Sequence, residues 1–149
     1  MGLDMYLYAK YYTSEYTDKE LNKKLWTLFP QLKPININMA EVKFEIGYWR
    51  KANAIHKWFV DNVQGGKDDC GSFYVSSEQL GELVKLCKKV LANRDLAPTK
   101  LPSESGFFFG STEYDEGYFD DLKHTVKTLS PLLEPDKYRG WDFEYHSSW

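Results

Sequence analysis

The sequence has few of the features that identify common protein classes. It contains only two cysteines, too few by themselves for a disulfide framework or a zinc site. No apolar run approaches the roughly 18 residues needed to cross a bilayer, so we expect no membrane-spanning segment. Basic residues are not in excess, because the net charge is −3. This balance disfavours salt-driven binding to duplex nucleic acid.

Other absences narrow the class further. No glycine-rich phosphate loop follows any expected strand, and there is no internal repeat or low-complexity segment. The opening residues MGLDMYLYAK have an acid at position 4 and no basic segment, so we expect no signal peptide and a cytoplasmic location. In a reducing compartment both cysteines should be free thiols. Cys87 lies on the apolar side of a helical pattern, and Cys70 lies in a polar turn.

Aromatic residues are abundant. The chain has 149 residues, of which 42% are hydrophobic and 17% aromatic, with 9 Phe, 11 Tyr and 5 Trp. This length and composition predict a single folded domain. Part of the aromatic excess must form the core, but Tyr and Trp also suit the binding of bases or protein partners.

Alternating apolar residues predict strands at 3–12, 40–49, 72–75 and 141–149. In the strand 40–49, the alternation assigns one face to Val42, Phe44, Ile46 and Tyr48. Residues 106–111 (GFFFGS) are a short apolar segment between glycines. This segment is interpreted as either a strand or a buried turn.

Helical periodicity predicts helices at 17–32, 51–63, 78–92 and 115–129. Thr17 and Glu20 have capping-box spacing, as do Ser76 and Gln79. Because the expected strands alternate instead of being apolar throughout, they favour a sheet with one open face. We therefore predict a single α+β domain with a mixed or antiparallel sheet of about 4–5 strands and about 4 helices.

The stretch EIGYWRKANAIHKWF, residues 45–59, is the first candidate site. Arg50 and Lys51 lie at a strand-to-helix junction, where free backbone amides bind anions well. Trp49 and Trp58 flank this junction and suit stacking on a base. The alternative is that these residues form the edge of the core, with their charges in water.

His56 has two interpretations. It can donate a hydrogen bond to a ligand, or it can be a buried histidine whose hydrogen bonds are satisfied within the core. Helical spacing places it opposite a polar face formed by Arg50, Asn53, Lys57 and Asp61. A catalytic pair of His56 with Cys70 is a third possibility, although an ordinary acidic turn explains Cys70 more simply.

Ser111, Thr112 and Glu113 form the second candidate, just before the helix 115–129. The simpler interpretation is a helix cap followed by acids that suit the helix dipole. The functional interpretation makes Glu113 or Asp115 a general base or a metal ligand. No further spaced carboxylate or histidine completes a metal set nearby, so no metal is expected.

The strings MGLDMYLY, EIGYWRKANAIHKWFV, DDCGSFYVS, SGFFFGSTEYDEGYFDDL and SSW together resemble a group of short, mostly uncharacterised proteins of tailed phages and prophages. The resemblance covers most of the chain. It implies a phage-related protein of the host cytoplasm and assigns no activity and no catalytic residues.

Phage origin, small size and aromatic-plus-basic content suggest a protein that sequesters a small phosphorylated ligand, such as a nucleotide-derived signal of host immunity. We expect no cofactor, and a homo-oligomer is possible. One alternative is an inhibitor that binds a host enzyme, and another is a small hydrolase or transferase using His56. The expected ligand-binding residues are Tyr48, Trp49, Arg50, Lys51, His56, Trp58, Ser111, Thr112 and Glu113.

Overall fold

A computed structural model describes residues 2–14, 16–35 and 39–149. Its four strands form one antiparallel sheet in the order β2-β1-β4-β3. The strands are β1 (Asp4–Ser14), β2 (Met39–Arg50), β3 (Ser72–Val75) and β4 (Trp141–Ser148). The predicted α+β class is confirmed, and the sheet is wholly antiparallel although helices separate most of the strands in sequence.

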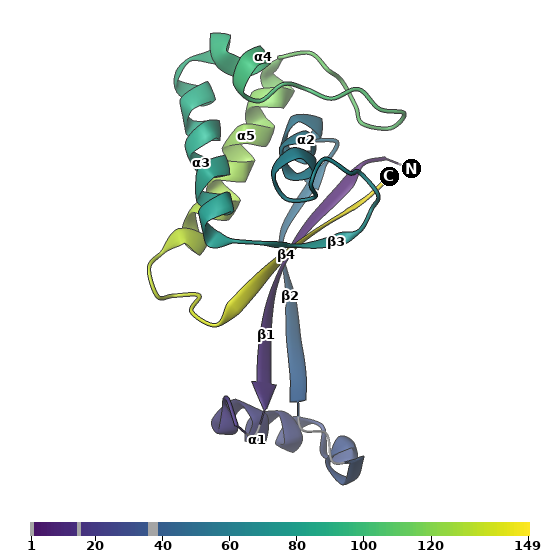
Figure 1. Ribbon diagram of the computed structural model, residues 1–149, viewed down its shortest axis with the longest axis vertical. Coiled ribbons are helices and arrows are strands. Elements are labelled where there is room, and N and C mark those ends of the chain that lie inside the picture. The colour runs from purple at the N-terminus through teal and green to yellow at the C-terminus, as the bar shows by residue number, and fades with distance from the viewer. Residues whose placement is uncertain (1, 15, 36–38) are drawn as a thin grey trace.

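Five α-helices accompany the sheet, and three of them cover one of its faces. Figure 1 shows α2, α3 and α5 gathered at one end of the molecule, while the β1–β2 hairpin reaches away from them and carries α1 at its far end. The helices are α1 (Lys19–Leu28), α2 (Asn53–Asn62), α3 (Ser77–Ala92), α4 (Ala97–Lys100) and α5 (Glu116–Leu129), with 3-10 turns η1 (Pro30–Ile35), η2 (Arg94–Leu96) and η3 (Ser130–Leu133).

The two faces of the sheet differ in character. The helix-covered face holds the core, in which Met5, Leu7 and Tyr145 are fully buried. The opposite face is open and rich in tyrosine, because residues that alternate with the buried ones point away from the helices. On this face the rings of Tyr6 and Tyr48 are 5.4 Å apart.

A β-bulge corrects the predicted faces of β2. Opposite the consecutive residues Leu7 and Tyr8, β2 skips from Gly47 to Glu45, which leaves Ile46 as an extra residue. The bulge reverses the alternation, so that Trp49 is buried with the core while Tyr48 is exposed. The prediction that Tyr48 shares the face of Val42 and Phe44 was therefore wrong.

The helix α3 follows the prediction closely. Ser76 accepts a hydrogen bond from the Gln79 amide and the Gln79 side chain accepts one from the Ser76 amide, which completes the predicted capping box. Cys87 is fully buried on the inner side of α3. Both Cys70 and Cys87 are free thiols, as predicted.

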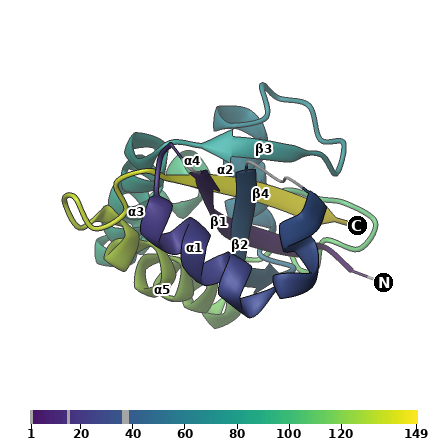
Figure 2. The ribbon, with the colours of Figure 1, turned by 90° about the horizontal axis from the view of Figure 1, so that it is seen from below.

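The helix α1 departs from the prediction. Its N-cap is Asp18, which accepts from the Leu21 amide, whereas Thr17 bonds back to Ser14. The helix ends at Leu28 and not at residue 32, and Leu28 is exposed. Figure 2 shows α1 lying across the far end of the hairpin, beyond the other helices. Within the described chain, α1 therefore contacts mainly β1 and the adjoining turn η1.

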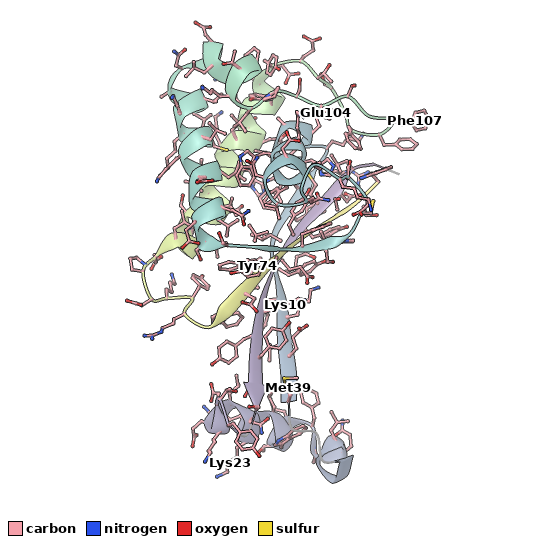
Figure 3. The ribbon with its side chains drawn as sticks, in the orientation of Figure 1. Lys10, Lys23, Met39, Tyr74, Glu104 and Phe107 are labelled. Atoms are coloured by element: carbon pink, nitrogen blue, oxygen red, sulfur yellow. The ribbon has the colours of Figure 1, made fainter. Side chains whose placement is uncertain are left out.

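Residues 106–111 are neither a strand nor wholly buried. Phe109 points into the core while Phe107 is 89% exposed, and Figure 3 shows Phe107 projecting from the loop. Within the described ranges, no helix is long and apolar enough to cross a membrane. The same ranges contain no cluster of side chains suited to a metal ion.

Candidate functional site

A network of hydrogen bonds around a buried histidine joins three separate segments of the chain. His56 on α2 is 1% exposed. Its Nδ1 lies 2.7 Å from the Tyr145 hydroxyl on β4, and its Nε2 lies 2.9 Å from Oδ2 of Asp68. The indole Nε1 of Trp149 donates to Oδ1 of the same carboxylate at 3.1 Å.

The hydrogen-bonding roles follow from the carboxylate. An ionised Asp68 only accepts, so Nε2 of His56 carries the proton that it donates. In a neutral imidazole Nδ1 then accepts from the Tyr145 hydroxyl, whose pKa burial raises well above its usual value. Both ring nitrogens of His56 are thus occupied, and neither is free to act as a base for Cys70.

A cavity of about 470 Å³ opens beside this histidine. Its size falls within the range of small-molecule sites, roughly 300–1,000 Å³. Its walls come from α2, the turn after α2, the loop before α5 and the last residue. They are formed by His56, Lys57, Val60, Asp61, Gly66, Asp68, Glu104, Ser105, Gly106, Phe107, Phe108, Phe109 and Trp149.

Aromatic rings form the apolar part of this cavity, which we call the α2 pocket. Phe109 is buried and meets His56 edge-on, with ring centroids 5.3 Å apart. Trp149 meets Phe109 at 5.9 Å and is 50% exposed. Phe107 and Trp149 therefore present aromatic surface that a flat ligand can cover.

The charges in the α2 pocket are mainly negative. Lys57 is its one cation within the described chain, and its ammonium is 3.1 Å from Asp61 and 3.2 Å from Glu104. Asp68 adds a third carboxylate. Such a lining favours a ligand with N–H donors and disfavours a bare phosphate inside the pocket.

One asparagine holds the aromatic loop in place. The side-chain amide of Asn53 donates to the carbonyls of Phe109 at 3.1 Å and Ser111 at 2.8 Å, and its oxygen accepts from the Glu104 amide at 3.1 Å. Asn53 is buried, although its helical spacing predicts a polar, exposed face. It thus positions the loop that lines the pocket.

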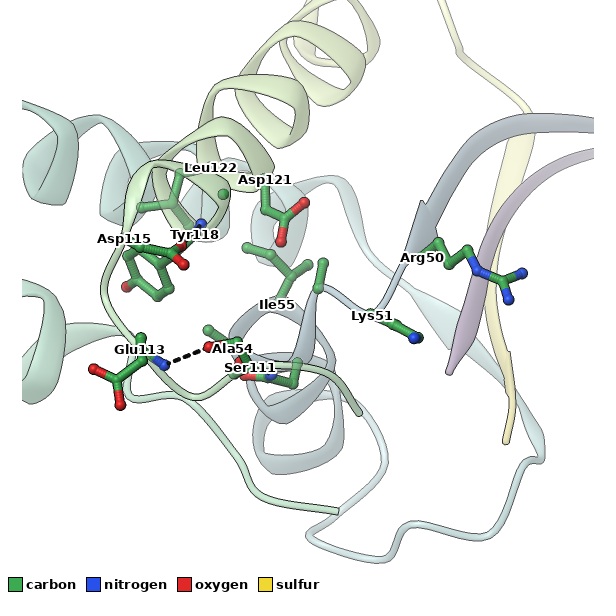
Figure 4. Close-up of a pocket in the computed structure, with 13 residues that line it drawn as sticks. Arg50, Lys51, Ala54, Ile55, Ser111, Glu113, Asp115, Tyr118, Asp121 and Leu122 are labelled. Carbon is green, nitrogen blue, oxygen red and sulfur yellow. Dashed lines mark hydrogen bonds between the residues drawn. The ribbon is translucent and has the colours of Figure 1, made fainter. Parts of the chain in front are cut away.

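A smaller hollow, of about 230 Å³, gathers four of the predicted ligand residues, Arg50, Lys51, Ser111 and Glu113, at the start of α2. Figure 4 shows Arg50 and Lys51 pointing away from the carboxylates of Asp115 and Asp121.

The charges of this smaller hollow do not suit a phosphate. The Arg50 guanidinium donates to Asp4 at 3.1 Å on the open face of the sheet. Burial raises the pKa of Asp121 to about 6, with Asp120 and Asp115 adding to the shift and His124 opposing it. Glu113, Asp115 and Asp121 all line the hollow, and together they would repel a phosphate.

The remaining predicted residues are spread over the fold. Trp49 is buried and donates to the Thr125 hydroxyl at 2.9 Å, and Trp58 is buried against Phe59. Neither indole has a free face for a base. Tyr48 lies on the open sheet face and donates to Asp4. The exposed Thr112 accepts from Ser103 through its carbonyl.

Comparison of the chain with protein-family models, curated proteins and solved structures finds no match. The residues that line the α2 pocket are thus the basis for assigning a function.

Sequence reasoning missed Asp68, Phe107 and Trp149 as members of one site. Asp68 lies in a polar turn, and the alternation that predicts the strand 141–149 does not show what Trp149 contacts. Trp149 and Asp68 are 81 residues apart in sequence. The aromatic excess was a signal of such a site, but it did not show which rings face the solvent.

Proposed function

We propose that the protein binds a small ligand with a flat, N–H-bearing ring, of the nucleobase kind, in the α2 pocket. The observation that carries the proposal is the Asp68 carboxylate, held by His56 and Trp149 at the wall of an aromatic cavity. An ionised carboxylate has about four lone-pair sites, so two remain for a ligand after these bonds.

The proposed contacts account for affinity as well as orientation. Stacking of a base on an aromatic side chain is worth about 1–3 kcal/mol, and Phe107 and Trp149 offer such surfaces. A hydrogen bond to a charged group adds about 1.5–3 kcal/mol. Carboxylates pair with the amino group of cytosine, and adenine and guanine also carry amino donors. We therefore expect amino-bearing bases to bind better than uracil.

The resemblance to phage proteins supports a biological role for ligand binding in the α2 pocket. In the proposal, the ligand is a nucleotide-derived signal of host immunity and the protein sequesters it without changing it. The phosphates stay outside the carboxylate-lined pocket. Arg50 and Lys51 remain the proposed phosphate partners. The Lys51 side chain lies beside Gly110 of the aromatic loop, and both cations point away from the carboxylates of Asp115 and Asp121 (Figure 4).

A panel of nucleosides and their monophosphates tests the proposal by calorimetric titration. We expect saturable binding of at least one amino-bearing nucleoside. Heating the complex should then release the ligand intact, whereas a chemically altered product would indicate an enzyme. Absence of binding by every member of the panel would overturn the nucleobase assignment.

A second candidate function, an inhibitor that binds a host enzyme, is favoured by the open sheet face. Tyr48 and Tyr74 are exposed there, and Tyr6, Tyr8 and His146 lie between them. Tyrosine is enriched at protein interfaces. Substituting Tyr48 and Tyr74 together by Ser tests it. A captured host protein should be lost, while nucleoside binding in the α2 pocket should be retained.

A further inference from the structure

The strand β2 forms one edge of the sheet, and among the described strands it pairs with β1 alone. Near its C-terminal end α5 covers this edge, where Nε2 of His124 lies 2.9 Å from the Tyr48 carbonyl. From Met39 to Glu45 no described strand pairs with the outer edge. Figure 1 shows this part of the hairpin extending beyond the helices.

The pairing of β2 with β1 shows which residues of β2 point their backbone N–H and C=O groups toward the outer edge. The Lys51 amide donates to the Leu3 carbonyl at 2.7 Å, so the odd-numbered residues of β1 bond toward β2. Tyr11 is opposite Val42, which therefore bonds inward. Glu41 and Lys43, on either side of Val42, then direct their N–H and C=O groups outward.

The common protections of an edge are missing here. Natural edge strands are blunted by proline, bulges, short length or a covering element. The segment Met39–Glu45 has no proline, and the bulge at Ile46 comes only after it. The protection that remains in this segment is the charge of Glu41, Lys43 and Glu45, which alternate in sign.

These charges make the edge complementary to itself. In an antiparallel pairing of two copies about Val42, Glu41 lies opposite Lys43 of the partner subunit, and the reverse contact forms by symmetry. These two residues are the ones whose backbone groups point outward. A pairing about Phe44 also matches Lys43 with Glu45, but it extends into Gly47 and Tyr48, where the bulge and His124 interrupt the edge.

We propose that two copies of the chain associate through the β2 edges, Met39–Glu45, paired antiparallel about a two-fold axis at Val42. The two sheets become one continuous sheet. An antiparallel arrangement directs each hairpin tip toward the other copy's body. Residues 16–35 at the tip carry four lysines and two acids, whereas the whole chain has a net charge of −3. The tip and the body therefore attract one another.

Two proline substitutions test the proposal, with sedimentation velocity as the readout. The wild type should sediment as a dimer. Glu41→Pro removes an outward N–H from each copy and should weaken the dimer by roughly tenfold or more, with little change in melting temperature. Ala40→Pro is the matched control, because its N–H faces β1 and its loss should lower the melting temperature.

Cysteine cross-linking tests the register, in a Cys70→Ser background. Val42→Cys places two thiols across the two-fold axis, where the Cα separation of about 4.5 Å between residues not joined by hydrogen bonds permits a disulfide. It should cross-link far faster than Thr27→Cys on exposed α1. A monomeric wild type at every concentration, a Glu41→Pro protein that remains dimeric, or equal cross-linking of the two cysteine variants would each overturn the proposal.

Discussion

Asp68 and Trp149, which are 81 residues apart in sequence, are joined by a hydrogen bond in which the indole donates to Oδ1 at 3.1 Å. The other carboxylate oxygen of Asp68, Oδ2, binds His56. The bond fixes the last residue of the sequence over the α2 pocket. It also holds the carboxylate to which we assign recognition of the ligand. Stability and binding therefore depend on the same group.

Replacing this carboxylate should affect both properties. Asp68→Asn keeps the size of the side chain but removes its charge. It also replaces one of the two accepting oxygens by an N–H donor. We expect the free energy of unfolding to fall by about 1–3 kcal/mol, and nucleoside binding to be lost. Urea denaturation and calorimetry measure the two effects. Asp69→Asn is the matched control, because this exposed neighbour pairs with Lys67 outside the pocket. Equal losses in the two variants would contradict the account.

Asn53 should control the aromatic loop. Asn53→Ala removes three hydrogen bonds to the segment 104–111. We expect faster amide hydrogen exchange of this loop and weaker binding in the α2 pocket. Asn53→Asp keeps the acceptor for the Glu104 amide and should have an intermediate effect. Unchanged exchange in Asn53→Ala would show that other contacts hold the loop.

The fold was predictable where local signals agree with packing. In α3, the capping box of Ser76 and Gln79 and the apolar stripe through Cys87 specify the same helix. The extension of the β1–β2 hairpin beyond the helices was not predictable. Apolar and polar residues alternate along β2 in the same way where helices cover the sheet and where they do not. The one local signal of the bulge at Ile46 is the adjacent Gly47, because an isolated glycine inside a strand often marks a bulge.

The candidate site was only partly predictable. His56 and Arg50 were singled out from one stretch, yet His56 bonds inward to Tyr145 while Arg50 bonds Asp4 on the open sheet face. Chain periodicity gives the side of a helix but not which distant segment covers it. The site depends on contacts between segments far apart in sequence, such as Trp149 with Asp68.

The free energy of unfolding should depend on pH because the carboxyl of Asp121 titrates differently in the folded and unfolded states. Its pKa is raised by burial to about 6 in the folded protein, so the folded state binds the proton more readily than the unfolded chain does. The resulting stabilisation is present in acid and is lost as the pH rises through about 6. Because the group is partly exposed, Asp121→Asn should stabilise by only about 1 kcal/mol near neutral pH.

Denaturation at two pH values checks this sign. Asp121→Asn should gain stability over the wild type at about pH 7.5 and gain little at about pH 4. Asp142→Asn is the control, because this exposed carboxylate on β4 is not among the groups that shift the pKa of Asp121. A larger gain in acid than at neutral pH would show that Asp121 is stabilised as the carboxylate.

The two thiols should differ in reactivity. Cys87 is fully buried, and burial raises the pKa of its thiol to about 12. Only Cys70, which is partly exposed, should react with a thiol reagent in the folded protein, and both should react after denaturation. A native count of two would mean that α3 opens readily.

The variant Arg50→Ala distinguishes binding of the phosphate from binding of the base. If Arg50 contacts phosphate, Arg50→Ala should weaken the binding of a nucleoside monophosphate by about ten- to a hundredfold. The parent nucleoside should bind as before, and stability should stay within about 0.5 kcal/mol because Arg50 is a surface residue. Unchanged affinity for every nucleotide would show that Arg50 contacts no phosphate.

The most direct test of the α2 pocket is calorimetric titration of nucleosides into Phe107→Ala. Phe107 is 89% exposed, so its loss should change stability by less than about 0.5 kcal/mol. The loss of a stacking ring should weaken binding by about 1–3 kcal/mol. Tyr74→Ala, an exposed aromatic outside the pocket, should bind like the wild type. Equal affinity of the Phe107→Ala and Tyr74→Ala proteins for the best nucleoside would contradict base binding in the α2 pocket.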